Sequence, residues 1–254
     1  MTLLFNAAKE TAMTRAQLAQ VPTPAPVGRF HYPLPYGDYV NEIVQACEAQ
    51  GFEVTHDEYA VRKDGGRFFG LIDVEPRAGE YISAREWSMQ IGVRGSHDQS
   101  LPRGLSFGSH VFVCSNLCFH GDLATLHTKQ TLNIRERLPR MINSAVAQLP
   151  AVAAQTQRRF DAYHAFEIKP RWGDAALVEL HRRDALSGAQ LTRAIREWDN
   201  PSFEAHAEDG FTAWRLLNAT TQALKPAEGE GGSLELVRRR SIVATNFLDE
   251  VVGL

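Results

Sequence analysis

The side chains best suited to chemistry are concentrated between Arg94 and His127. This stretch contains imidazoles, carboxylates and hydroxyls in the segments 94-RGSHDQS-100 and 120-HGD-122, with His110 between them. Imidazole and carboxylate are the usual protein ligands of divalent metals. A metal-dependent enzyme such as a nuclease would therefore use His97, Asp98, His120 and His127.

The spacing of these residues does not select a metal site or a catalytic triad. No His-Glu-x-x-His or His-x-His pattern occurs, and alternation along a strand would send His110 and its neighbours to different faces. Ser96-His97-Asp98 has the composition of a triad, but consecutive residues cannot align nucleophile, base and orienting carboxylate. Structural histidines remain the alternative interpretation, no cofactor is predicted, and enzymatic activity is left open but is less favoured than binding.

Basic side chains bracket the same stretch. Residues 129–160 contain six Lys and Arg against the single acid Glu136, in a chain whose formal net charge is -3. Rows of arginine commonly bind phosphates, because the guanidinium fork matches phosphate oxygens. An ordinary solvated helix face is the alternative. The nucleic-acid contacts that this pattern predicts are Arg94, Arg103, Lys129, Arg135, Arg137 and Arg140.

Hydrophobic spacing predicts the elements that position these residues. Apolar residues recur at helical spacing over 37–50, and β-rich segments flank Asp64-Gly65-Gly66, which is a strong hairpin signal. Alternation over 86–98 and β-branched residues over 107–119 predict two further strands. We therefore expect an antiparallel sheet of at least four strands within about 52–128.

The pattern changes after about Lys129, where apolar residues recur every 3.6 positions. Helices are expected through 129–254, and Pro139 and Pro150 should kink or interrupt the first of them. The predicted fold class is α+β: an N-terminal helix plus the antiparallel sheet, followed by a mostly helical C-terminal half.

The N-terminal segment differs from the rest. Residues 3–19 have the spacing of an amphipathic helix, and three prolines in 21-VPTPAPVG-28 then break the pattern. This predicts a helix and proline-rich arm over 1–29, before a single α+β domain over 30–254.

Composition limits the compartment and the class of protein. Hydrophobic residues make up 44% and charged residues 22% of the chain, which is typical of a globular protein. No run approaches the roughly eighteen consecutive apolar residues of a membrane span, so no membrane partner is predicted. Three cysteines without framework spacing favour a reducing cytoplasm.

Two blocks of sequence resemble a known family. The segment 91-IGVRGSHDQSLPRGLSFGSHVFVCSNLCFHGD-122, followed by His127-Thr128, resembles the signature of a domain-of-unknown-function family carried by phages and plasmids. A second block, Thr212 to Thr221 with Leu224-Lys225 after it, follows in the family's order. The resemblance covers about 30–250 and implies a mobile-element protein working inside a bacterial host cell, and it carries over no catalytic residue.

The order of the predicted elements is similar in outline to the core of phage single-strand annealing proteins, which hold DNA in a positive groove. The function predicted from the sequence is an accessory protein that binds single-stranded DNA in recombination or annealing. A metal-dependent nuclease and an anti-defence protein that binds a host protein remain open. Self-association into a homo-oligomer through the N-terminal helix also remains open.

Overall fold

The computed structural model describes residues 10–28, 30–77, 87–111, 116–119, 126–225 and 234–254. Its contacts divide the chain into two compact units. The first comprises Met1–Ser83, Ser88–Gly108 and Asp122–Ala153, and the second comprises Ala84–Trp87, Ser109–Gly121 and Ala154–Leu254. The described part of the proline-rich arm thus belongs to the first unit, together with most of the sheet.

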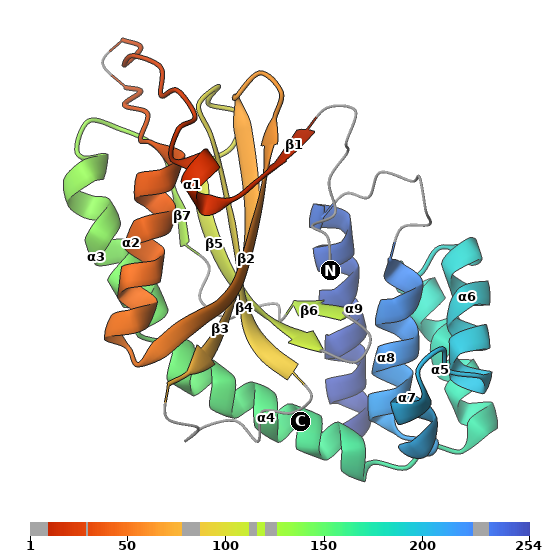
Figure 1. The fold of residues 1–254 in the computed structure, drawn as a ribbon. Coiled ribbons are helices and arrows are strands. Elements are labelled where there is room, and N and C mark those ends of the chain that lie inside the picture. The colour runs from red at the N-terminus through yellow and green to blue at the C-terminus, as the bar shows by residue number, and fades with distance from the viewer. Residues whose placement is uncertain (1–9, 29, 78–86, 112–115, 120–125, 226–233) are drawn as a thin grey trace. The chain divides into compact units, whose positions relative to one another are not determined.

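The described strands form one seven-stranded sheet in the order β1-β2-β3-β4-β5-β6, with β7 beside β5 (Figure 1). The pairs of known register are antiparallel, which confirms the predicted sheet and the α+β class. The predicted strand over 107–119 is two strands, because β5 ends at Val111 and β6 begins at Asn116. The bounds are β1 Glu10–Met13, β2 Phe52–Arg62, β3 Arg67–Pro76, β4 Trp87–Ser96, β5 Arg103–Val111, β6 Asn116–Phe119 and β7 Leu126–Thr128.

The predicted hairpin at Asp64-Gly65-Gly66 is confirmed between β2 and β3. Gly65 has a φ of 73°, a conformation that residues with a side chain rarely adopt. The Asp64 carboxylate accepts a hydrogen bond from the Gly66 amide at 2.8 Å, which closes the turn. The hairpin end is therefore held by its own side chains and lies beside the loop that follows β4, where the His97 amide donates to the Gly66 carbonyl.

Helix α2 (Tyr36–Ala49) confirms the helix predicted over 37–50 and covers one face of the first unit's sheet (Figure 1). Its buried residues recur at helical spacing and include Tyr36, Tyr39 and Ile43. Both tyrosine rings pack against Phe68 of β3, at centroid distances of 4.4 and 6.2 Å. The face of the sheet that carries Phe68 is therefore the covered, apolar face.

The helix predicted over 3–19 is wrong for the residues that the structure describes. Residues 10–13 form β1, which pairs with β2, and only Arg15–Leu18 form a helix, α1, capped by Thr14 and Gln17. The edge of β2 offers backbone partners to the segment, and this tertiary pairing overrides local helical spacing. Residues 1–9 of the predicted helix lie outside the described residues.

Three contacts fix the N-terminal segment onto the first unit. The Leu18 side chain is fully buried, and Arg15 pairs with Asp57 at 2.5 Å. Gly37 of α2 lies so close to Ala19 that a Cβ at position 37 would come within 2.7 Å of the Ala19 Cα. The segment is thus part of the packed structure.

The first helices of the C-terminal half are α3 (Ile134–Val146) and α4 (Leu149–Ala165). Pro139 lies inside α3 without ending it, so the expected interruption does not occur there. Pro150 is the second residue of α4, where its missing N–H has no helical partner to lose. The break in the helix therefore falls just before Pro150.

The second unit is mostly helical, as predicted for this part of the chain. Helix α8 is its centre, because residues 213–221 are all buried. Arg215 of α8 donates to the carbonyl of Trp198 at 2.6 and 3.0 Å, which ties α8 to the end of α6. The bounds of its remaining helices are α5 Pro170–Arg182, α6 Gly188–Asp199, α7 Glu204–Glu208, α8 Ala213–Leu224 and α9 Leu234–Val252.

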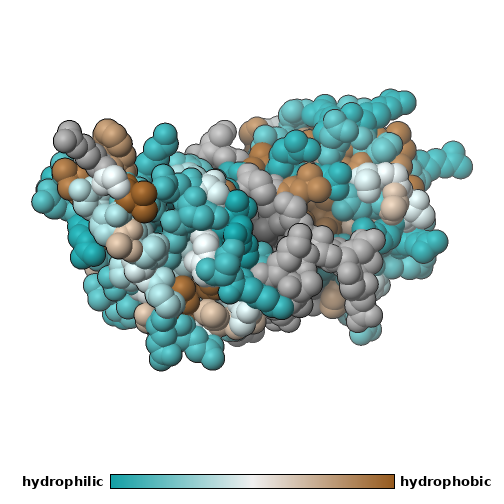
Figure 2. All heavy atoms as spheres, turned by 90° about the horizontal axis from the view of Figure 1, so that it is seen from above, coloured by the Kyte–Doolittle hydropathy of each residue, from teal (hydrophilic) through white to brown (hydrophobic). Residues whose placement is uncertain are grey.

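Hydrophilic residues cover most of the face seen in Figure 2, and hydrophobic residues are scattered there. Among the described residues, no helix combines the length and the apolar character that crossing a bilayer would require.

We expect Gly37→Ala to destabilise the first unit. The new methyl would meet the backbone of Ala19, which cannot move as a flexible side chain can, and overpacking of this kind costs about 1–3 kcal/mol. Chemical denaturation should show this loss, and limited proteolysis should cut the segment at 10–28 faster. Gly188→Ala is the matched control, because a Cβ there meets nothing within 4 Å. Equal unfolding free energies for the two variants would contradict this account.

Candidate functional site

Arg103, at the start of β5, lies inside the first unit and has no exposed surface. It shares the inward face of the strand with Leu105 and Phe107, which are also buried. Its Nη2 donates hydrogen bonds to the carbonyl oxygen of Leu34 and to Oε1 of Gln130, the latter at 3.2 Å. The guanidinium thus joins the chain before α2 to the chain after β7.

The guanidinium of Arg103 is surrounded by aromatic rings, where a buried arginine would usually have a carboxylate partner. Its central carbon lies 4.8, 5.3 and 5.5 Å from the ring centroids of Tyr36, Tyr39 and Phe68, which is within the range of a cation–π interaction. Nε and Nη1 have no hydrogen-bond partner among the described residues, and burial lowers the pKa of Arg103 to about 10. The predicted phosphate contact by Arg103 does not fit this environment, because solvent cannot reach the side chain.

His97 stacks on the ring of Tyr36. The two rings are nearly parallel, with an interplanar angle of 6° and a centroid distance of 3.9 Å. The His97 amide also donates to the Tyr36 hydroxyl at 3.1 Å, and that hydroxyl donates to the Gly65 carbonyl at 2.9 Å. Arg103 and His97 therefore both pack against Tyr36, next to the β2–β3 turn.

The hydrogen bonds of His97 define its tautomer. Nε2 lies 2.9 Å from the Leu34 carbonyl oxygen, and a carbonyl only accepts, so Nε2 carries the proton. Nδ1 is buried without a partner among the described residues, which costs about 1–3 kcal/mol when the group stays unsatisfied. Burial lowers the pKa of His97, and the nearby charges of Arg103 and His31 lower it further. The ring is therefore neutral, and Nδ1 keeps an unused lone pair.

The opposite face of the sheet carries Arg94, Gly104 and His127 in a row across three strands. Arg94 pairs with Phe69, one position beyond Phe68, so it points away from α2. A Cβ at Gly104 would come within 3.1 Å of the Arg94 side chain. Arg94 therefore lies across β5 where there is no side chain, and its guanidinium reaches Nδ1 of His127 at 3.5 Å.

Two arginines of α3 lie beside β7, next to this cluster. Arg137 donates at 3.2 Å to the hydroxyl of Thr128, which pairs with Arg103 and so lies on the other face of β7 from His127. Arg140 lines a hollow of about 420 Å³ together with His127. Lys129 directly follows β7 and is exposed. We name the set of Arg94, His127, Lys129, Arg137 and Arg140 the β7–α3 surface.

Arg135 does not share this surface. At 100° per residue, it lies roughly 140–160° around the helix axis from both Arg137 and Arg140. It is exposed beside the buried stripe that includes Ile134 and Leu138. The helix therefore separates one of the predicted phosphate contacts from the other two.

Three cations of the β7–α3 surface differ from several arginines elsewhere in the protein in whether they form ion pairs with carboxylates. Among the described residues, no carboxylate forms an ion pair with Lys129, Arg137 or Arg140. Elsewhere, arginines pair at short distances, 2.9 Å for Arg159 with Asp249 and 2.8 Å for Arg183 with Glu250. No described carboxylate thus compensates the positive charge of Lys129, Arg137 and Arg140 through an ion pair.

The residues of the predicted metal site do not converge where they are described. His97 and Asp98 follow β4, and Asp98 accepts from Ser100 and pairs with Arg67 at 3.4 Å. His127 lies on the opposite face, beside Arg94. His120 and the side chain of His110 lie outside the described residues. No group of three or more metal-ligating side chains occurs in the described part of the chain.

The second sequence block is structural where it is described. It forms α8, whose Trp214 and Asn218 side chains are buried in the second unit. Comparison of the chain with protein-family models, with curated proteins and with solved structures gives no match. The family resemblance therefore stays a prediction, and the function must be argued from the geometry.

We expect the lowered pKa of His97 to make stability fall as the pH drops below about 6.5, the value of an unperturbed histidine. The unfolded chain then binds a proton that the folded ring does not accept, since burial disfavours the charged ring and the nearby charge of Arg103 adds to this effect. His97→Phe should flatten the decline in Tm between pH 7 and pH 5. His56→Gln, an exposed histidine on β2, is the control. An unchanged pH dependence in His97→Phe would refute this assignment.

Proposed function

We propose that this protein binds single-stranded nucleic acid through the β7–α3 surface. The observation that carries the proposal is the grouping of three exposed cations, Lys129, Arg137 and Arg140, none of which forms an ion pair with a described carboxylate, around one short strand and one helix face. Phosphate groups are the natural occupants, because Arg presents paired donors and Lys a point charge to their oxygens. Arg103 and Arg135 are not part of the proposed contact.

The arrangement supports backbone contact more than base recognition. Arg94 lies over Gly104 and contacts His127, and Arg137 is oriented by the Thr128 hydroxyl. Side chains restrained in this way lose less conformational entropy when they bind a ligand. Contacts to phosphate carry no sequence information, so we expect affinity for nucleic acid with little sequence preference.

The choice of a single strand rests on the similarity in element order to annealing proteins. Phosphate contacts alone would also accept duplex DNA. Competition between a labelled oligothymidylate and unlabelled duplex of the same length separates these two outcomes. The expected role in recombination or annealing for a phage or plasmid depends on preference for the single strand.

We expect Arg137→Glu/Arg140→Glu to weaken binding of oligothymidylate strongly and to reduce its salt dependence. Loss of two phosphate contacts should reduce the slope of log K against log salt by about 1.4, since each single-strand contact contributes about 0.7. Fluorescence anisotropy between about 50 and 200 mM salt measures both quantities.

Arg171→Glu/Arg196→Glu is the matched control, because it changes the net charge equally at two exposed arginines of the second unit. It should leave the slope unchanged. If wild-type protein shows no binding at low salt, or if both double variants lose affinity equally, the proposed surface is wrong.

A further inference from the structure

The exposed hydrophobic side chains of the first unit lie in two short segments. Among the described residues of this unit, the large hydrophobic side chains with high exposure are Val27, Phe30 and Leu132, at 61%, 82% and 62%. Described hydrophobic side chains of the second unit reach at most 43%, apart from the C-terminal residue Leu254. Single exposed apolar residues are common on protein surfaces, whereas a group of them marks a contact surface.

Hydrogen bonds join the two segments. The Tyr32 amide donates to the Gln130 carbonyl at 2.8 Å, and the Leu34 amide donates to Oε1 of Gln130 at 2.9 Å. Phe30 precedes Tyr32 by two residues, and Leu132 follows Gln130 by two. The exposed apolar side chains therefore come from neighbouring stretches of the chain.

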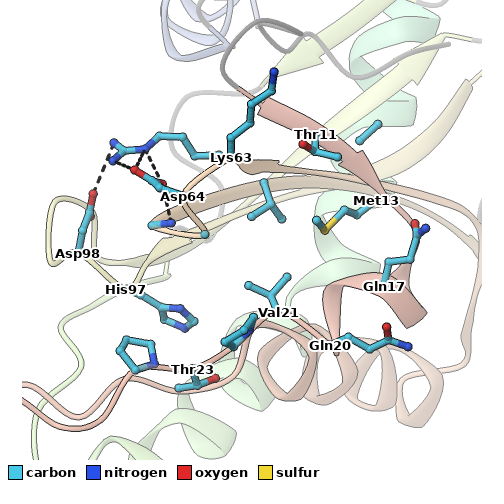
Figure 3. A pocket seen from close by; sticks show the side chains of 17 residues that line it. Thr11, Met13, Gln17, Gln20, Val21, Thr23, Lys63, Asp64, His97 and Asp98 are labelled. Atoms are coloured by element: carbon cyan, nitrogen blue, oxygen red, sulfur yellow. Dashed lines mark hydrogen bonds and ion pairs between the residues drawn. The ribbon is translucent and has the colours of Figure 1, made fainter.

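The proline-rich arm leads into the segment that carries Phe30. The arm lies across a cavity of about 860 Å³ from the end of the β2–β3 hairpin, and Figure 3 shows Val21 and Thr23 of the arm at this cavity, with Asp64 of the hairpin beyond it. The arm therefore passes over the hairpin end before it reaches the exposed turn.

The turn that carries Phe30 is anchored to the first unit. The Val27 amide donates to the His31 carbonyl at 3.1 Å, which closes the turn. The His31 side chain is buried, and its Nε2 donates to the His97 carbonyl at 3.1 Å. Phe30 is thus an exposed aromatic ring on a fixed backbone, and such a ring loses little conformational entropy when it makes a contact.

This turn lies next to one end of the β7–α3 surface. Lys129, an exposed member of that surface, immediately precedes Gln130, the hydrogen-bond partner of Tyr32. Three peptide units and one hydrogen bond separate Phe30 from Lys129, which limits the distance between their Cα atoms to about 18 Å. About five nucleotides span this distance at the ~3.4 Å spacing of a stacked strand. One short strand can therefore contact both residues.

Single-stranded nucleic acid is the partner that fits an aromatic ring beside such cations. Its phosphates pair with Lys and Arg, and its unpaired bases present flat faces that stack on aromatic side chains. A lipid surface also combines negative charge with apolar groups, but helices that bind it expose an apolar face. The apolar face of α3 is buried, since Ile134, Leu138 and Ile142 lie in the core.

We propose that Phe30 stacks on an unpaired base of the strand whose phosphates the β7–α3 surface binds. The inference rests on the proposed function and gives the preference for a single strand a structural basis, because neighbouring base pairs cover these faces in a duplex. Phe30 distinguishes unpaired from paired bases. It does not distinguish one base from another, since every base has a face that can stack.

The test compares oligothymidylate with an oligomer of the same length made of abasic tetrahydrofuran nucleotides, which keeps the phosphates and lacks the bases. We expect Phe30→Ala to weaken binding of oligothymidylate by about 5- to 150-fold, the value of one stacked base. Affinity for the abasic oligomer and the salt dependence should stay unchanged, since no phosphate contact is lost. Fluorescence anisotropy measures all three quantities.

The nature of the side chain separates stacking from general apolar contact. Phe30→Trp keeps an aromatic face and should bind oligothymidylate at least as tightly as the wild type, whereas Phe30→Leu should weaken it as Phe30→Ala does. Trp172→Ala, at an exposed aromatic residue of the second unit, is the matched control and should bind as the wild type does. Thermal melts establish that each variant is folded.

The proposal is overturned if Phe30→Ala or Phe30→Leu binds oligothymidylate as tightly as the wild type, or if Phe30→Ala weakens binding of both oligomers equally. It is also overturned if Phe30→Ala loses binding to phosphatidylserine vesicles but keeps its oligothymidylate affinity, which would assign Phe30 to a membrane contact. Binding that still depends on Arg137 and Arg140 would leave the proposed function intact in each case. Absence of binding to either oligomer by the wild type would end both proposals.

Discussion

The first unit depends on a buried positive charge that no described carboxylate compensates. Arg103 gives two hydrogen bonds through Nη2 and otherwise contacts the faces of three aromatic rings. Desolvating a guanidinium in this way is expensive. The cost is offset because one side chain joins three distant segments: the Leu34 carbonyl before α2, β5 itself, and Gln130 after β7. The same Leu34 oxygen accepts from His97, so the contacts among Arg103, Tyr36 and His97 fix both the start of α2 and the loop after β4.

Because side chains alternate along β5, neighbouring residues face two different environments: the aromatic cage on one face of the sheet and the Arg94 cluster on the other. Arg103 points toward α2, and Gly104 beside it leaves space on the other face for Arg94. A shift of one residue in the register of β5 would remove Arg103 from the aromatic cage and place it on the face that carries Arg94, because every side chain of β5 would change face. Tyr39 helps to hold this register, because its hydroxyl donates to the Gly104 carbonyl at 2.9 Å.

Much of the fold could be predicted from the sequence, because its local signals agree with the tertiary structure. Asp64-Gly65-Gly66 supplies the positive φ of its turn, and α2 has apolar spacing over its whole length. The N-terminal segment could not be predicted in the same way, since pairing with the edge of β2 depends on a strand about fifty residues later in the sequence. The spacing of residues within the N-terminal segment therefore could not predict its pairing with β2.

The candidate site residues also depend on tertiary structure that the local sequence does not reveal. Arg94 and Arg103 are chemically identical in the sequence, and the position where β5 begins decides whether Arg103 is buried. A strand starting at 107 leaves Arg103 in a loop, whereas the strand from 103 places it in line with Leu105 and Phe107. That alternation was a usable signal for its burial. The role of Gly104 had no such signal, because it depends on which side chain crosses it.

The cavity beside His97 follows from how the N-terminal segment is attached. β1 and α1 are fixed by backbone pairing, by Arg15 with Asp57 and by the buried Leu18. The arm that follows contains prolines, which lack amide donors and cannot add a further strand to the sheet. A chain fixed before its prolines and again at Tyr32, whose amide donates to the Gln130 carbonyl at 2.8 Å, must cross the hairpin end without pairing to it. The space beneath it is therefore a consequence of the chain path, and His97 is the residue that the aromatic stack holds at its wall.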